Sequence, residues 1–232
     1  MTPMTSFLLG SLMLTSSVAA QRTWIVDQFG PGDFKDLPEA FEAASPADNL
    51  IVKPGFYRGA STNKGIRVYS IGAFVPSGVI EVYDLPRDET FVIDSFSSAP
   101  TGTQLLFRNC RGTIYVGPFE QSYTVNPHPT PSRVTIESCD NVVFHHCWLH
   151  DVRIKSSTVL FSDCVIRGMA IPWPVGDTAT PALTVGNSHV TMIHPNLDGA
   201  LGQHTATSTP PPPPGVEMRG GTLILAGEGP CA

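Results

Sequence analysis

The strongest constraint on the fold is a short internal repeat, of about 17–18 residues, in the second half of the chain. Val134 recurs one unit later as Val152, and Phe144-His-His-Cys147 recurs as Phe161-Ser-Asp-Cys164. A unit this short cannot bury its own apolar side chains, so neighbouring units must stack to form a core. The chain is therefore expected to be a stack of similar layers.

Further copies of the unit lie on both sides of this pair. Residues 154–168 align without a gap on residues 185–199, and residues 216–225 match residues 152–161 in character. Upstream, Leu106-Phe-Arg-Asn-Cys110 contains another Phe-x-x-Cys. The repeat thus continues through most of the second half of the chain.

Each unit contains two or three short runs in which apolar and polar residues alternate, separated by Asn, Asp, Gly or Ser. Such alternation is typical of β-strands, and strands stacked at about 4.8 Å bury every second side chain. We therefore predict an all-β fold: a single-stranded right-handed parallel β-helix (a solenoid) with a short N-terminal capping helix. The expected inward side chains are Val142, Phe144, Leu149, Val159, Phe161, Ile166, Val190, Met192, Leu197, Leu223 and Leu225.

Three proline-rich segments interrupt the strands, near residues 117–132, 168–181 and 200–215. The last contains the run Pro210–Pro214, which favours polyproline II and cannot donate to a sheet. These segments are expected to be surface loops inserted into the stack.

A helix is predicted only near the N-terminus, over residues 37–44, with Asp36 as its cap and Pro38 in its first turn. Strands are expected at residues 23–27 and 49–52, on either side of this helix. Since an open end of a stack exposes apolar side chains, the helix is expected to cover it.

The segment around this helix resembles a known family. Gly30-x-Gly-Asp-Phe-Lys35, Leu37, Glu39-Ala40 and Val52-Lys-Pro-Gly-Phe-Tyr-Arg58 are similar to the entry segment of pectin methylesterases. The same segment opens many proteins of the pectin lyase-like superfamily, so the resemblance implies a right-handed parallel β-helix. The resemblance covers residues 23–58, and beyond them only the repeat is shared. The superfamily includes lyases, esterases, hydrolases, epimerases and proteins without activity.

The departures from the pectin methylesterase pattern concern catalysis. Gly59 stands where that pattern continues with Glu, and Ile171-Pro-Trp173 lacks the arginine of the family's Arg-Pro-Trp segment. Counterparts of the two catalytic aspartate segments and of the glutamine-bearing segment are missing from the sequence. No catalytic residue is therefore carried over from the family.

The first 20 residues are typical of a signal peptide. They contain no charged side chain, an apolar run at 7–14, and Val18-Ala-Ala20 before a cleavage point at Gln21. We predict residues 1–20 as a signal peptide and residues 21–232 as one β-helix domain, either secreted and extracellular or periplasmic. An uncleaved tail or an N-terminal anchor is the alternative.

The charge balance and hydropathy exclude two classes of partner. The chain has 14 Lys and Arg against 20 Asp and Glu, a net charge of −6, which disfavours binding to a phosphate backbone. No later segment is apolar enough to span a membrane. We therefore predict no nucleic-acid partner and no membrane span; the oligomeric state is not defined by the sequence.

Five cysteines follow the predicted signal peptide, so at least one thiol has no partner within the chain. Cys147 and Cys164 occupy equivalent positions of adjacent units, which favours an inward column of thiols over a disulfide. Cys139 and Cys231 are the remaining candidates for pairing.

The densest group of possible metal ligands is His145-His146-x-x-x-His150. However, His146, Asp163 and His194 each follow an inward residue by two, and a polar residue recurring there indicates a stacked turn. We therefore predict no metal site and no cofactor.

Asp151 and Arg153 place an acid beside a cation. The repeat sets Arg133 opposite Asp151 and Glu137 opposite Lys155 on adjacent units. This pattern favours exposed ion pairs between neighbouring strands over a catalytic acid.

Two tryptophans are the candidate ligand-binding residues, because exposed aromatic rings on a rigid scaffold suit sugar stacking. Trp148 is expected to point outward, and Trp173 lies in a proline-rich loop. Outward-facing Val143, Leu160 and Ile224 form an apolar strip that needs a covering loop or a partner. Burial of Trp148 under a loop is the alternative.

The sequence thus predicts a secreted, non-catalytic protein that binds a polysaccharide or cell-surface glycan, or serves as an interaction scaffold. A diverged polysaccharide-active enzyme, an esterase or a lyase, is the alternative. A structural domain completed by a partner chain is a third possibility. The enzyme's catalytic residues would lie among His146, His150, Asp151, Arg153 and Asp163.

Overall fold

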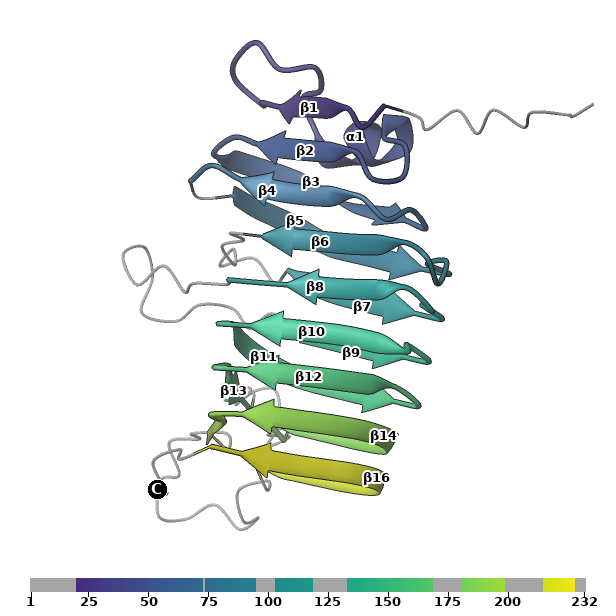
Figure 1. The fold of residues 1–232 in the computed structure, drawn as a ribbon. Helices are drawn as coiled ribbons and strands as arrows, with labels where there is room; N and C mark the ends of the chain where they lie inside the picture. The colour runs from purple at the N-terminus through teal and green to yellow at the C-terminus, as the bar shows by residue number, and fades with distance from the viewer. Residues whose placement is uncertain are drawn as a thin grey trace, which may run out of the picture.

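The computed structural model describes residues 20–72, 74–94, 103–118, 133–168, 181–198 and 215–227. It is an all-β structure with one short helix, and every strand pairing within these residues is parallel (Figure 1). The strands form three stacks around one core. Several long strands bend from one stack into the next and so join the stacks into a single sheet.

Stack A forms the front in Figure 1. Its strands, in order, are β1 (Thr23–Val26), β2 (Asn49–Val52), β4 (Arg67–Ser70), β6 (Thr90–Asp94), β8 (Thr113–Val116), β10 (Asn141–His145), β12 (Thr158–Ser162) and the second halves of β14 (Leu183–Ile193) and β16 (Val216–Ala226).

Stack B lies behind it and stack C closes the third side. Stack B contains β3 (Gly55–Thr62), β5 (Phe74–Tyr83), β7 (Gln104–Arg108), β9 (Arg133–Glu137), the second half of β11 (Trp148–Lys155) and the first halves of β14 and β16. Stack C contains the first half of β11, β13 (Val165–Arg167) and β15 (Asn196–Asp198).

The register of the strands confirms the repeat. Val152 pairs with Val134, and Phe144 pairs with Phe161. The gapless alignment of 154–168 on 185–199 is also the pairing in space, through all three stacks. The spacing of apolar residues therefore predicts which residues are neighbours along the stack.

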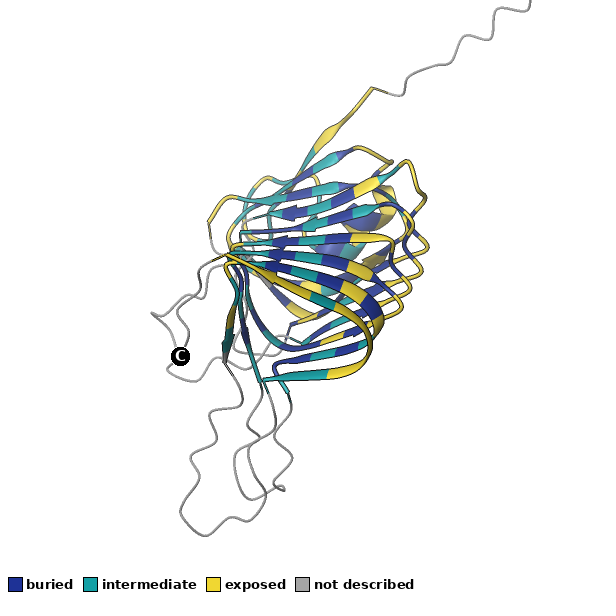
Figure 2. Cartoon of the chain, turned by 60° about the horizontal axis from the view of Figure 1, so that its bottom comes forward, coloured by how far each residue is buried: buried dark blue, intermediate teal, exposed yellow. Residues whose placement is uncertain are grey.

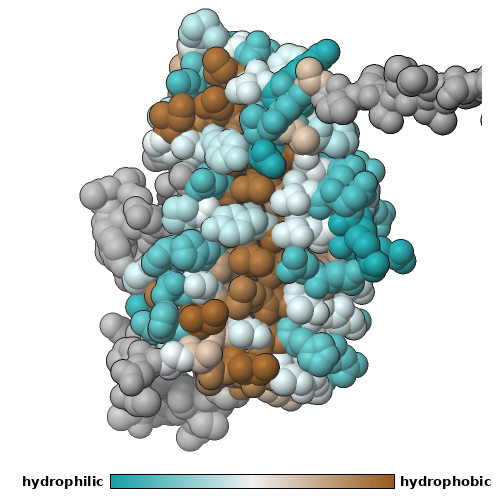
Figure 3. All heavy atoms as spheres, viewed as in Figure 1, coloured by the Kyte–Doolittle hydropathy of each residue, from teal (hydrophilic) through white to brown (hydrophobic). Residues whose placement is uncertain are grey.

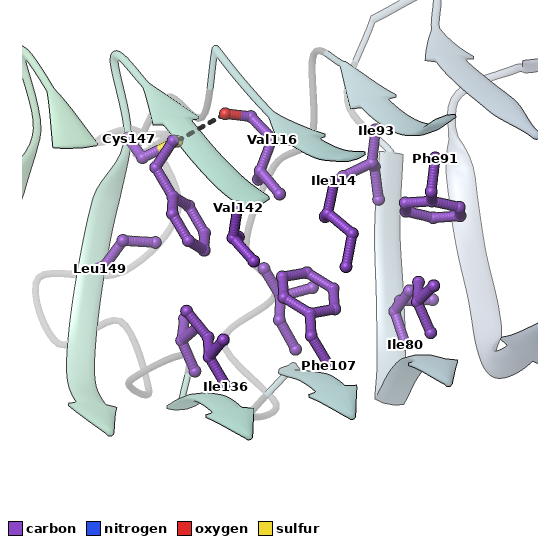
Figure 4. Close-up of a cluster of buried hydrophobic side chains, with 14 of the residues drawn as sticks. Ile80, Phe91, Ile93, Phe107, Ile114, Val116, Ile136, Val142, Cys147 and Leu149 are labelled. Atoms are coloured by element: carbon purple, nitrogen blue, oxygen red, sulfur yellow. Dashed lines mark hydrogen bonds between the residues drawn. The ribbon is translucent and has the colours of Figure 1, made fainter. Parts of the chain in front are cut away.

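The core is a column of inward side chains from the three stacks. Burial alternates along the strands, as the bands of Figure 2 show. The Phe144 ring lies between Phe161, at 5.0 Å and nearly parallel, and Phe107 of stack B, at 6.3 Å between ring centroids. Figure 4 shows Phe107 and Ile136 meeting the stack A side chains in this interior.

Most of the expected inward side chains are buried, but three at the C-terminal end are not. Leu197 and Leu223 are only half-buried, and Leu225, which pairs with buried Met192 in the inward row, is nevertheless 56% exposed. β16 is the last described strand of the stack, so no further described layer covers its inner face.

The predicted helix is confirmed as α1 (Leu37–Ala43), one residue shorter than expected. Asp36 caps it by accepting a hydrogen bond from the Leu37 amide at 2.9 Å. Its apolar side chains, including Phe41, are buried, and the helix lies at the β1 end of the stack (Figure 1). At its C-terminus the Lys64 ammonium donates to the Ala44 carbonyl oxygen at 2.7 Å.

A four-residue unit ends several strands of stack A and most strands of stack B: an inward residue, an outward residue, a residue in left-handed conformation, and a second inward residue. At the edge between stacks A and C, the A–C edge, the left-handed residues are His146, Asp163 and His194, with φ of 50°, 55° and 49°. At the edge between stacks B and A, the B–A edge, they are Asp84, Asn109, Ser138, Ser156 and Asn187.

This unit explains an ambiguity in the repeat. Phe107 and Cys110 belong to the B–A edge, where they pair with the layer of Ile136 and Cys139. They are not equivalents of Phe144 and Cys147, which belong to the A–C edge. The upstream Phe-x-x-Cys unit is therefore not a repeat of Phe144–Cys147, although both edges use the same local pattern.

The second inward residues form an inner column behind each edge. At the B–A edge the Ser157 hydroxyl accepts from the Cys139 amide at 3.0 Å and donates to the Lys155 carbonyl oxygen at 2.7 Å. Ser188 repeats both bonds one layer on. At the A–C edge the column is Cys147 and Cys164, buried with free thiols as predicted.

Cys139 is also a free, buried thiol, and its side chain faces Cys110. The suggested pairing of Cys139 with Cys231 is therefore wrong for Cys139. Cys231 lies outside the described residues, as does the predicted signal peptide up to residue 19.

The undescribed internal segments longer than one residue connect the same two places in the fold. Each follows a strand of stack A or stack C and precedes a strand of stack B; they are residues 95–102, 119–132, 169–180 and 199–214. The predicted proline-rich loops fall largely within them. The turns of the B–A edge, in contrast, are short throughout the described layers from Asp84 to Gly221.

Candidate functional site

The residues singled out from the sequence lie in two separate places. His146 and Asp163 meet at the A–C edge, whereas Asp151 and Arg153 lie where stack C turns into stack B. His150 ends the stack C half of β11, so it does not share a face with His146 as expected from their spacing. Trp173 lies outside the described residues.

The A–C edge gathers His145, His146 and Asp163. One possible ligand atom of each lies within 4.8 Å of the others, and the two imidazole centroids are 4.3 Å apart. His146 is exposed, while His145 and Asp163 are half-buried. We call these three residues the histidine cluster.

The Asp163 carboxylate is held in place from two sides. The Ser162 hydroxyl donates to its Oδ2 at 2.8 Å, and the Nδ1 of His194 lies 2.9 Å from its Oδ1. These two hydrogen bonds, with the nearby charge of His194 and His146, lower the pKa of Asp163. The carboxylate is therefore ionised and oriented at neutral pH.

The part of His194 in this arrangement was not foreseen. The gapless alignment contained the necessary signal, since it places His194 opposite Asp163 just as it places Val185 opposite Ile154. Equal spacing predicts adjacent layers, and the backbone bond from the Asp163 amide to the Ile193 carbonyl oxygen confirms it, at 3.0 Å. The turn interpretation of His146 is correct for the backbone but omits these side-chain contacts.

Asp151 forms a buried ion-pair site rather than an exposed ladder. Its carboxylate, 2% exposed, accepts from Arg133 Nε at 2.7 Å and from Arg153 Nε at 2.9 Å. The pairing with Arg133 is as predicted, but the expected exposure is wrong because Asp151 bulges at the corner, between the register positions of His150 and Val152. Both oxygens of this carboxylate are thus engaged by guanidinium groups of the protein itself.

Trp148 is half-buried and packs against the core, instead of standing open to solvent. The Arg167 guanidinium lies over its ring, 5.0 Å from the centroid. Burial, and then the charge of Arg167, lower the pKa of the neighbouring His150. In this part of stack C, side chains of the protein itself therefore cover the Trp148 ring.

A shallow groove along the B–A edge was not predicted from the sequence. It consists of two adjoining hollows of about 440 and 460 Å³ that share Asp84 and Asn109. The first is also lined by Ser61, Glu81, Tyr83 and Arg108, and the second by Leu85, Pro86, Arg111, Ser138 and Asp140. The sequence signal is the column of left-handed polar residues, which lines one side of the groove.

The groove is rich in hydrogen-bonding groups held in place by one another. Glu81 forms an ion pair with Arg108, and the Ser61 hydroxyl donates to Glu81 at 3.3 Å. Arg87 lies 3.6 Å from Asp140, which lines the second hollow. Tyr83 adds an aromatic ring, 38% exposed.

The outward strip of stack A is confirmed. Val143 pairs with Leu160, and Ile224 lies two layers on, in the same row. Figure 3 shows hydrophobic residues along the middle of this face, interrupted by paler and hydrophilic ones. Nothing in the described structure covers Ile224, which is 52% exposed.

The chain was compared with family models, curated proteins and solved structures, and no match was found in any of the three. Among the described residues there is no helix with the length and hydropathy needed to cross a membrane.

Proposed function

We propose that this protein is an exported right-handed parallel β-helix that binds a carbohydrate chain in the groove of the B–A edge without cleaving it. The handedness follows from a general rule: connections between parallel strands of one sheet are right-handed in about 98% of cases. Export is proposed from the sequence of residues 1–20 alone.

The observation that carries the proposal is the composition and shape of the groove. Its lining of carboxylate, guanidinium, amide and hydroxyl groups suits a polyhydroxylated ligand better than an apolar one. The two hollows continue along the stack, which suits a chain rather than a compact molecule. The Tyr83 ring offers a stacking surface.

The dispersal of the candidate catalytic residues favours binding over catalysis. Asp151 is neutralised by two arginines, and His150 lies at a different corner from the pair of His146 and Asp163. None of these five candidates lines the groove of the B–A edge. A diverged esterase or lyase would need several of them to face one bound substrate.

The test combines binding and product analysis on a panel of acidic and neutral polysaccharides. Affinity electrophoresis measures binding, and mass spectrometry detects cleaved chains, unsaturated ends or lost ester groups. We expect retardation by at least one polysaccharide with no product. Tyr83→Ala is expected to weaken that binding about tenfold, the equivalent of ~1.4 kcal/mol.

Trp148→Ala is the matched control, because it removes an aromatic ring outside the groove. Loss of binding in Trp148→Ala with binding retained in Tyr83→Ala would move the site to stack C. Any reaction product would overturn the non-catalytic proposal, and failure to bind every polysaccharide would overturn the proposed ligand class.

A further inference from the structure

We propose that the histidine cluster is a binding site for a divalent transition metal ion such as Zn²⁺, with His145, His146 and Asp163 as ligands. The ligand atoms are at most 4.8 Å apart. Ligand atoms around tetrahedral zinc are about 3.4 Å apart, as follows from metal–ligand distances of about 2.0–2.2 Å. Small rotations of these solvent-facing side chains close the difference.

The ligand set selects the class of metal. Two imidazole nitrogens and one carboxylate suit Zn²⁺, Ni²⁺ or Cu²⁺, whereas Ca²⁺ and Mg²⁺ prefer ligands that are all oxygen. Cys147 follows the cluster in sequence, but its thiol is buried on the core side of the edge. Three protein ligands leave at least one coordination position for water or an added ligand.

His194 contacts the Asp163 carboxylate without being one of the proposed metal ligands. Its Nδ1 lies 2.9 Å from Asp163 Oδ1, and the Ser162 hydroxyl binds the other oxygen. Such outer partners orient a ligating carboxylate and are expected to contribute to metal affinity. The carboxylate is thus held by two groups from outside the ligand set.

Turn geometry alone does not account for the cluster. It requires a residue that tolerates left-handed conformation, which the described B–A edge meets with Asp, Asn and Ser in five layers and with Gly220 in the next. His145 is the last residue of β10, outside the left-handed position, and still belongs to the cluster.

Glycines lie on either side of the cluster and its outer partner His194: Gly117 next to His145 and Gly227 next to His194. A Cβ on Gly117 would lie 2.1 Å from the His145 carbonyl oxygen, and one on Gly227 would lie 2.5 Å from the His194 ring. No side chain of these two positions therefore crowds the histidines along the edge.

The test is calorimetric titration of the protein, prepared without an affinity tag, with Zn²⁺ and separately with Ca²⁺ at neutral pH. We expect saturable binding of one Zn²⁺ and none of Ca²⁺. Co²⁺ is expected to give the visible absorption of a low-coordinate site, which is a second readout independent of heat.

Three variants, one of them a double substitution, define the site while keeping its backbone. His145→Thr with His146→Asn, and separately Asp163→Asn, are expected to lower Zn²⁺ affinity by more than the roughly 10–100-fold typical of losing an outer partner. His194→Asn is expected to show that smaller, roughly 10–100-fold loss. Asn is chosen because Asn109 and Asn187 already occupy the equivalent left-handed positions.

His189→Asn is the matched control, since His189 is an exposed histidine at the other end of the stack A part of β14. Unchanged affinity there supports the assignment. Zn²⁺ binding that survives the double substitution, absence of saturable Zn²⁺ binding, or a preference for Ca²⁺ would overturn it. Circular dichroism of each variant shows that the fold is retained, and glycan binding remains a separate measurement.

Discussion

The two edges of stack A are built from the same four-residue unit but present different chemistry. The B–A edge repeats Asp, Asn and Ser over five layers, backed by an inner column of one leucine, then two cysteines and two serines. The A–C edge presents His146, Asp163 and His194, backed by two cysteines. The backbone thus determines the position of each polar side chain but not the residue type, which can therefore differ between the edges and suit different ligands.

The largest expected effect tests whether both edges depend on one core. Phe144→Ala removes the central ring of the aromatic column, and we expect a loss of about 3–5 kcal/mol in the free energy of unfolding. Chemical denaturation measures it. Because β10 runs from one edge to the other, glycan and Zn²⁺ binding should fail together on denaturation.

Val143→Ala is the control, since Val143 is the outward neighbour of Phe144 and only half-buried. A loss similar to that of Phe144→Ala would mean that the core is not centred on the aromatic column.

The next effect concerns the inner column of the B–A edge. Ser157→Ala leaves the buried Cys139 amide without its acceptor, and we expect a loss of about 1–3 kcal/mol. Thermal unfolding measures it. Ser157→Cys should recover part of the loss, since cysteine holds the equivalent positions 110 and 139. Equal stability of Ser157→Ala and the parent protein would show that the hydroxyl ladder is dispensable.

The third effect tests the left-handed positions themselves. Asn109→Ala places a residue poorly suited to φ of 56° at the B–A edge, and we expect a loss of about 1 kcal/mol. Asn109→Gly should lose less, because glycine adopts this conformation freely. At the A–C edge, His146→Asn should leave stability unchanged. A clear destabilisation there would show that the histidine supports the fold.

The smallest effect is the pH dependence of the A–C edge. The pKa of Asp163 is lowered in the folded protein, so its contribution to stability is present above the unfolded value of about 4 and is lost as the pH falls through the lowered value. Carboxyl ¹³C NMR measures the titration. His194→Asn should raise the Asp163 pKa toward its ordinary value, and an unchanged titration would refute the pairing.

The sequence predicts the layers better than it predicts the sites. Alternating Val, Ile and Phe define inward rows, and their spacing fixes the register because a one-residue slip would turn each row outward. Asp151 defeats this reasoning, since one extra residue at a corner breaks the alternation and turns its side chain into a buried position. Burial at a bulge depends on the surrounding chain, here the two arginines that reach it.

The sites depend on contacts across layers that no local motif encodes. His194 meets Asp163 only because the chain completes one whole layer between them, and the groove arises where turns from several layers line up. A repeated polar position can be recognised in the sequence. Its side-chain partners can be predicted only when the edge to which it belongs is known. The Phe-x-x-Cys pattern does not identify the edge, because both edges share it.

The position of the longer connections has a consequence for how such a chain can change over evolutionary time. All four undescribed internal segments longer than one residue enter ahead of stack B, whereas the described B–A turns from Asp84 onward stay short. Insertions and deletions on the first flank leave every strand pairing intact, whereas a change of length at a B–A turn would displace a whole layer. The connections that lead into stack B can thus change in length, whereas the B–A turns must keep theirs. A family with this fold would therefore diversify mainly in the connections that lead into stack B.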